Sequence, residues 1–151
     1  MNARVSPAEI AVREIRVEDA EAVAQLSGEL GYPAAVPKMA DRIRSYRALA
    51  DHVTYVACLA EDRVVAWIDV GVAHHLQAEP YAEIGGLVVA NGMRNANIGS
   101  RLVARAEQWA AERGIRTVRV RSQIARERAH RFYLRLGYER TKTSAVFSKE
   151  I

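Results

Sequence analysis

The sequence lacks the features that mark exported, disulfide-bonded or membrane-spanning proteins. Its 151 residues include a single cysteine, Cys58, so no disulfide can form within the chain. No apolar run is long enough to span a bilayer, and residues 1–10 lack the apolar core of a signal peptide. We therefore expect a soluble protein that stays in the cytoplasm.

The chain also lacks internal repeats, low-complexity tracts and linker-like stretches. Half of its residues are hydrophobic, which suits one globular domain with a core, whereas two domains of this total length would each be undersized. We predict a flexible arm at residues 1–10 and a single domain over residues 11–151.

Two further absences exclude kinds of catalytic site. Cys58 lies in the apolar run Val-Ala-Cys-Leu, which predicts a buried side chain rather than a nucleophile, and no nucleophile elbow is present. His74 and His75 are adjacent, so a strand would direct them to opposite faces, and no third ligand is spaced nearby. The sequence therefore predicts neither a serine or cysteine nucleophile nor a metal site.

Acidic residues are slightly outnumbered, with 22 Lys and Arg against 18 Asp and Glu, and arginines concentrate in the C-terminal half. Arg119 and Arg121 alternate with valines, as on the solvated outer face of a strand. No aromatic residues interleave with them to stack on bases. A basic nucleic-acid-binding domain is thus the weakest interpretation of the chain, and nucleic acid is not the partner we expect.

Hydrophobic periodicity predicts the element order of a mixed sheet with helices on its faces, in the α+β class. Pro37 fits the first turn of a helix, and Gly31 and Gly137 fit helix ends. The predicted strands are residues 11–17, 53–60, 64–72, 81–89, 115–121, 138–140 and 145–149, and the predicted helices are residues 18–30, 36–50, 98–113 and 126–136.

The stretch from Leu87 to Ala110 changes from a short β-branched run, through polar turn residues, to apolar positions at helical spacing. Such a strand, loop and helix present unpaired N–H groups and the positive end of the helix dipole, which together attract a phosphate. Gly85 and Gly86 precede this stretch within the strand and predict a β-bulge or a close approach by another backbone or a ligand.

Together, the element order, the strand end at residues 87–89, the loop Arg-Asn-Ala-Asn-Ile-Gly at residues 94–99 and the run Phe-Tyr-Leu-Arg-Leu-Gly-Tyr at residues 132–138 resemble the GNAT superfamily of acyl-CoA-dependent N-acetyltransferases. The resemblance covers about residues 12–147. It implies a GNAT-like fold, with a central, mostly antiparallel twisted sheet of about seven strands flanked by about four helices. It also implies acetyl-CoA as cosubstrate and an amine as acceptor.

In the resembled family the loop before the third helix wraps the pyrophosphate of coenzyme A. Arg94 and Gly99 match the family pattern, whereas Asn95 and Asn97 stand where glycines are usual. Asparagine is the side chain that best tolerates the left-handed backbone region, so it can keep the loop shape. Arg126 stands where the family often has a cofactor-contacting Asn. The resemblance implies a cofactor-binding set of Leu87, Val88, Val89, Arg94, Asn95, Ala96, Asn97, Ile98, Gly99, Ser100 and Arg126.

Acyl transfer to an amine requires a neutral nitrogen, since an unperturbed lysine amine has a pKa of about 10.4. Glu83 occupies the position where several family members carry a catalytic Glu, so it is a candidate base, with a water chain as the alternative. Backbone N–H groups of residues 87–89 would stabilise the oxyanion. Tyr133 is the family's usual proton donor to the departing thiolate, and the alternative for it is a core aromatic.

The acceptor would enter between the loop of the first helices and the central strands. That position makes acceptor-site candidates of Tyr32, Trp67, Asp69, His74 and Tyr81. A rival interpretation is a non-catalytic acyl-CoA-binding or regulatory module on the same fold. Exposed edge strands late in the chain are compatible with a homodimer.

Overall fold

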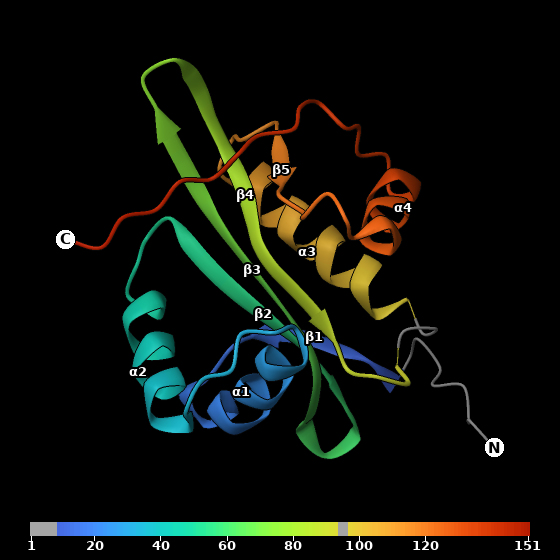
Figure 1. Ribbon diagram of the computed structural model, residues 1–151. Helices are drawn as coiled ribbons and strands as arrows, with labels where there is room; N and C mark the ends of the chain where they lie inside the picture. Colours follow the sequence, from blue (N-terminus) through green and yellow to red (C-terminus); the bar gives the residue numbers. More distant parts are fainter. Residues whose placement is uncertain (1–8, 94–96) are drawn as a thin grey trace. The chain divides into compact units, whose positions relative to one another are not determined.

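The computed structural model describes residues 9–93 and 97–151 (Figure 1). The chain separates into two compact units, Met1–Val120 and Arg121–Ile151. Among the helices of the described residues, none has the length and apolar character that a bilayer crossing requires. The predicted arm at residues 1–10 lies almost wholly outside the described residues.

The first unit is built on a five-stranded sheet in the order β1-β2-β3-β4-β5. The first three strand pairs are antiparallel, and β4 and β5 are parallel, with α3 as the crossover between them. Its elements are β1 (Ala11–Glu14), α1 (Ala20–Glu29), α2 (Val36–Arg47), β2 (His52–Leu59), β3 (Arg63–His75), β4 (Ala78–Val89), α3 (Ile98–Glu112) and β5 (Val118–Val120).

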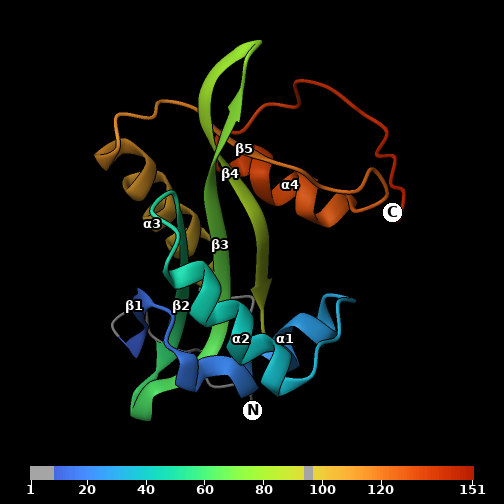
Figure 2. The same cartoon turned by 90° about the vertical axis from the view of Figure 1, so that its left-hand side faces the viewer.

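Helices cover both faces of this sheet (Figure 2). Val23 of α1 and Ile43 of α2 pack with Val56 and Cys58 of β2 in one apolar cluster. On the other face, α3 buries a stripe of six apolar residues. The stripe consists of Ile98, Leu102, Val103, Ala106, Trp109 and Ala110.

Local signals in the sequence account for most element ends in this unit. Pro37 lies in the first turn of α2, where its missing N–H costs no helical hydrogen bond. Gly31 follows α1 with a φ of 100°, a left-handed conformation that favours glycine. Cys58 is buried, as predicted, and burial raises the pKa of its thiol, so it is not a reactive thiolate.

A β-bulge interrupts β4 where the double glycine predicts one. Asp69 of β3 pairs with Gly86, and the next residue, Val70, pairs with Ile84, so Gly85 is the extra residue. Beyond the bulge, the pairing of β4 with β5 does not continue among the described residues, because that ladder joins only Ala82–Ile84 to Val118–Val120. Residues 82–84 of β4 therefore pair with strands on both sides, whereas residues 86–89 pair with β3 alone among the described residues.

The second unit contains α4 (Glu127–Arg135), which ends near Gly137 at a φ of 91°. Residues 138–140 and 145–149, predicted as strands, form no strand, so the sheet has five strands among the described residues rather than about seven. A strand is stable when its backbone is paired and one face is buried, whereas Val146 and Phe147 are exposed. The edge strands that made a homodimer reasonable are therefore absent from the described structure.

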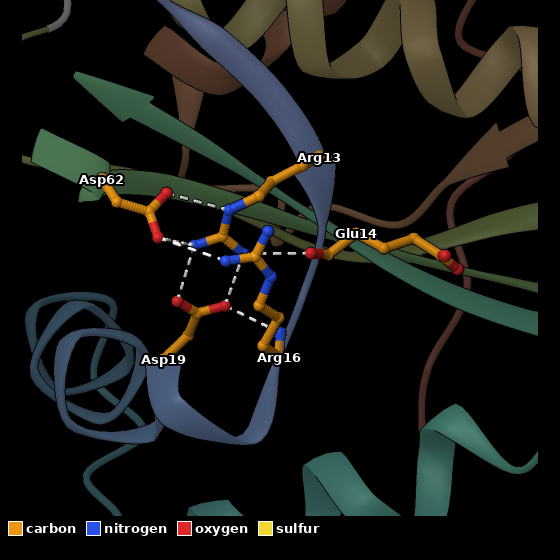
Figure 3. Close-up of polar contacts among 5 residues, drawn as sticks. All are labelled: Arg13, Glu14, Arg16, Asp19 and Asp62. Atoms are coloured by element: carbon orange, nitrogen blue, oxygen red, sulfur yellow. Dashed lines mark hydrogen bonds and ion pairs between the residues drawn. The ribbon is translucent and has the colours of Figure 1, made fainter. Parts of the chain in front are cut away.

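An ion-pair cluster joins β1, the first helical turn and the β2–β3 hairpin (Figure 3). Arg13 Nη1 and Nη2 donate to the two oxygens of Asp19 at 2.8 Å each, and the Arg16 N–H donates to Asp19 Oδ2 at 2.7 Å. Arg13 Nε also donates to Asp62 Oδ1 at 3.0 Å. Burial raises the pKa of the Asp19 carboxyl, but the Arg13 and Arg16 hydrogen bonds outweigh burial and leave the pKa below its usual value.

We expect Asp19→Asn to destabilise the protein by about 2 kcal/mol at pH 7, because it removes a nearly buried charge that accepts three hydrogen bonds. Since the pKa of Asp19 is lowered by folding, its contribution is complete above its usual value near 3.8 and is lost as pH falls through the folded value. Urea unfolding at pH 7 and pH 3 measures this difference. Asp41→Asn, which removes an exposed pair with Arg44, is the control and should change stability by less than about 0.5 kcal/mol.

Candidate functional site

A cavity of about 490 Å³ lies in the first unit, between the sheet and the two N-terminal helices. Residues of α1, α2, β1, β2, β3 and β4 contribute to its wall. The apolar part of the lining includes Val23, Met39 and Ile43, which also belong to the core under α1 and α2. A volume of this size accommodates a small polar molecule.

Three side chains in close contact, His52, Thr54 and Asp69, form the polar floor of the cavity. Asp69 Oδ1 accepts a hydrogen bond from Thr54 Oγ1 at 2.9 Å and lies 2.6 Å from His52 Nε2. The side chains of His52 and Asp69 are 16% and 29% exposed, so both are shielded but Asp69 still reaches the cavity. The pleat explains this arrangement, because Thr54 and Asp69 are directly paired residues of β2 and β3 and share one face.

Glycines on β4 and β3 leave room for these side chains. A methyl group at Gly86 would lie 2.7 Å from the Trp67 ring, and one at Gly85 would lie 3.1 Å from Asp69 Oδ2. A methyl group at Gly71 would lie 3.2 Å from His52 Cδ2. The bulge thus brings the backbone of β4 to the edge of the cavity, immediately before residues 87–89.

Cationic side chains from α2 line the side of the cavity opposite the sheet. Arg42 and Arg47 are exposed, and neither forms an ion pair with another residue of the described ranges. Glu14 of β1 is the second carboxylate among the lining residues. The cavity therefore offers carboxylates and guanidinium groups at the same time, which suits a ligand that carries both signs of charge.

Three of the five predicted acceptor-site residues line this cavity, namely Tyr32, Trp67 and Asp69. The other two lie on the β3–β4 hairpin, which projects beyond β2 (Figure 1), and are not among the lining residues. His74 Nε2 is 3.4 Å from Asp51 Oδ2. The Tyr81 hydroxyl is 3.3 Å from His75 Nε2, and Arg119 lies over its ring.

The predicted donor site is described in part. Arg94, Asn95 and Ala96 lie outside the described residues. Asn97 precedes α3 with a φ of 56°, in the left-handed region that asparagine tolerates best. Ile98, Gly99 and Ser100 form the first turn of α3, whose N–H groups have no partner within the helix. Leu87, Val88 and Val89 end β4.

Glu83 lies on β4, half-buried, on the same sheet face as the cavity. In the register it pairs with Gly71 of β3 and Arg119 of β5. Gly71 in turn pairs with His52, so Glu83 and His52 belong to one cross-strand row. Glu83 is not among the residues that line the cavity.

Tyr133 and Arg126 belong to the second unit. Tyr133 is half-buried in α4, with the rings of Phe132 and Tyr138 at 5.1 Å and 5.8 Å. Burial raises the pKa of its hydroxyl above 10.0, opposed by the positive charge of Arg126. The phenol is therefore protonated at neutral pH and can donate a proton.

Four residues of the cavity, His52, Thr54, Arg42 and Arg47, were not predicted from the sequence. The two β2 residues become visible only once the register with β3 places them beside Asp69. Arg42 and Arg47 are exposed residues of α2, and nothing in their local sequence indicates that a cavity lies beside them. A signal was available, because polar residues at alternate positions of β2 and β3 mark a sheet face that is not entirely core.

Comparison with known proteins identifies the family. The model of the acetyltransferase (GNAT) family matches residues 14–138, which include parts of both units. The aminoalkylphosphonate N-acetyltransferase of Salmonella typhimurium is 39% identical over 94 residues, which are 62% of this chain and 61% of the relative. The chain thus matches less than two thirds of this relative's length.

Solved structures show the same fold. An aminoglycoside 6'-N-acetyltransferase from Acinetobacter baumannii superposes with a TM-score of 0.83 at 18% identity, over 94% of this chain and 99% of that one. An aminoglycoside N-acetyltransferase in complex with CoA gives a TM-score of 0.82 at 14% identity, over 94% and 95%. The predicted α+β class and GNAT-like fold are confirmed, and the chain belongs to the acetyltransferase (GNAT) family.

Proposed function

We propose that the protein transfers the acetyl group of acetyl-CoA to a primary amine, by direct attack of the amine in a ternary complex. Membership of the acetyltransferase (GNAT) family supports this proposal, as does similarity to an N-acetyltransferase. The observation that carries it is the position of the cavity, whose wall includes the backbone of Gly85 and Gly86. An amine in this cavity lies next to the strand that we assign to the thioester.

The donor site proposed here consists of the end of β4 and the start of α3. The backbone of residues 87–89 would hold the thioester and stabilise the oxyanion, because the β4–β5 ladder stops at Ile84. The first turn of α3, with its dipole and free N–H groups, would bind the pyrophosphate together with residues 94–97. Arg126 is proposed as a further phosphate contact, and Tyr133 as the donor of a proton to the thiolate.

The acceptor that fits the cavity best is a small amine that also carries an anionic group. Asp69 and Glu14 attract an ammonium group, and Arg42 and Arg47 provide donors for an anion. The Salmonella relative acts, by its name, on aminoalkylphosphonates, which have both groups. We therefore propose an aminoalkylphosphonate or a similar amino acid-like molecule as the acceptor.

The test is release of free thiol from acetyl-CoA with matched amines. We expect an aminoalkylphosphonate to have a higher kcat/KM than an aminoalcohol of the same chain length. The double variant Arg42→Gln/Arg47→Gln should lower kcat/KM for the phosphonate by about 30-fold, since two charge-assisted hydrogen bonds are lost. It should change kcat/KM for the aminoalcohol by less than about threefold.

Arg44→Gln is the matched control, because Arg44 is on the same helix, pairs with Asp41 and does not line the cavity. Equal losses for both amines in the double variant would contradict the anion site. Calorimetric binding of acetyl-CoA without thiol release for any amine would favour the non-catalytic module instead.

We propose one catalytic domain over residues 11–151, supported by a family match that includes parts of both units. A cytoplasmic setting is supported by the buried free thiol of Cys58. Packing of Arg119 over the Tyr81 ring at 4.1 Å supports a structural role for this arginine rather than nucleic-acid binding. A homodimer remains a prediction.

A further inference from the structure

Of the two carboxylate oxygens of Asp69, Oδ1 has close polar partners, whereas Oδ2 has no hydrogen-bond partner among the described residues. Oδ1 accepts the hydrogen bond from Thr54 Oγ1 and lies 2.6 Å from His52 Nε2, which fixes the plane of the carboxylate. Oδ2 lies on the side of Gly85, where a methyl group would be 3.1 Å away. Asp69 is therefore held rigidly, with Oδ2 close to the β4 bulge.

The register places Asp69 closer than Glu83 to the end of β4. Asp69 pairs with Gly86, the residue directly before 87–89, whereas Glu83 pairs with Gly71 on the far side of the bulge. Asp69 also lines the cavity, and Glu83 does not. Of the two carboxylates, Asp69 is the one that an amine in the cavity would meet beside the thioester strand.

The contacts of His52 favour a role in which it positions the carboxylate of Asp69. Its Nε2 faces Asp69 Oδ1, and its Nδ1 is buried without a hydrogen-bond partner among the described residues. Tyr46 packs edge-on against the imidazole at 5.0 Å between ring centroids. The imidazole is thus held between α2 and β3, where it orients the carboxylate.

We propose that Asp69 accepts the proton of the acceptor ammonium, with His52 and Thr54 as positioning residues. This inference rests on the proposed function. The ammonium passes one proton to Asp69 Oδ2, and the neutral nitrogen attacks the thioester carbonyl carbon. As the C–N bond forms and the C–S bond breaks, the nitrogen releases a second proton to solvent, and the departing thiolate takes one proton from Tyr133, which solvent then reprotonates. The proton on Asp69 then leaves to solvent, so one proton is released per turnover.

The pH profile of kcat/KM is the central measurement. Charged and titratable groups that face Asp69 or its cavity are Glu14 from β1, Tyr32 from the α1–α2 loop, Arg42, Tyr46 and Arg47 from α2, and His52 from β2. We expect Asp69→Asn to lower kcat by about 100-fold. Its residual kcat/KM should rise about tenfold per pH unit, because only the fraction of amine already neutral in solution can react.

Thr54→Val and His52→Gln each remove one partner of Asp69 but keep the carboxylate. We expect each variant to lower kcat/KM by about five- to twentyfold and to move the acidic limb of its pH profile to higher pH. Thr54→Val removes a hydrogen bond to the carboxylate, and His52→Gln removes the close imidazole contact. If Thr54 and His52 had only a structural role, the variants would lower kcat/KM without moving the acidic limb of the pH profile. These two variants also keep the proposal testable if Asp69→Asn fails to fold.

Glu83→Gln tests the alternative that Glu83 is the base. We expect this variant to lower kcat/KM by less than tenfold. Asp51→Asn, on an exposed carboxylate that contacts His74, is the control for a general charge effect. A larger loss in Glu83→Gln than in Asp69→Asn would overturn the inference, as would an Asp69→Asn variant with a raised KM but normal kcat. Wild-type protein that acetylates no amine would contradict the proposed function and this inference together.

Discussion

Tyr133→Phe is expected to lower kcat by about 100- to 1,000-fold while the Kd for acetyl-CoA changes by less than about twofold. The physical reason is the hydroxyl proton, which burial keeps in place by raising the pKa of Tyr133 above 10.0. Loss of this proton leaves the thiolate to depart without protonation. Steady-state kinetics and calorimetry with acetyl-CoA separate the two quantities.

The control for this variant is Tyr138→Phe, which removes a hydroxyl from the neighbouring ring of the same unit. We expect its kcat to stay within about fivefold of the wild-type value. In the wild-type protein, activity should persist up to a basic limb above pH 10, because the raised pKa keeps Tyr133 protonated. Equal losses of kcat and acetyl-CoA affinity, or no loss of either, would contradict the acid role.

Gly86→Ala is expected to destabilise the protein by about 1 to 3 kcal/mol and to raise the KM for the acceptor. The added methyl group would lie 2.7 Å and 2.8 Å from two carbon atoms of the Trp67 ring, which is rigid and packs against the core cluster. The ring must therefore move, and Trp67 lines the cavity. Urea unfolding measures stability, and amine titration measures the KM.

Gly28→Ala is the matched control and should act in the opposite direction. No atom lies within 4 Å of a methyl group at Gly28, which is in α1, so alanine should stabilise the protein by about 0.5 kcal/mol. A Gly86→Ala variant with wild-type stability and KM would show that Trp67 adapts without cost, and would remove our explanation for this glycine.

The sequence predicted the fold well where local chemistry determines the structure. Gly31 ends α1 in a left-handed conformation, Pro37 begins α2, and the double glycine marks the β4 bulge. Asn97 adopts the left-handed conformation that its place in the motif requires. Each of these features depends on the backbone preference of one residue and its immediate neighbours, so one sequence is enough to predict it.

The parts that were wrong or missed depend on contacts between distant residues. Alternation predicted strands at residues 138–140 and 145–149, but pairing decides whether a short edge segment becomes a strand, and pairing is not local. His52 of β2 contacts Asp69 of β3. The register that brings the two side chains together depends on an irregularity between Ala57 and Cys58, which the sequence does not reveal. Tyr32, Trp67 and Asp69 line the same cavity. Their grouping could be predicted only because the family resemblance carries information about contacts between residues far apart in the sequence.

The extra residue at Gly85 has a consequence for how this strand is compared with others. Before it, Ala82 and Ile84 lie on the sheet face opposite the cavity, whereas after it Gly86 and Val88 lie on the cavity face, because the extra residue shifts the alternation by half a period. In a relative that lacks this extra residue, the aligned positions after it would lie on the other face of the sheet. Residues of β4 in such relatives should be matched by the face they occupy, since matching by sequence position would exchange residues of one sheet face for residues of the other.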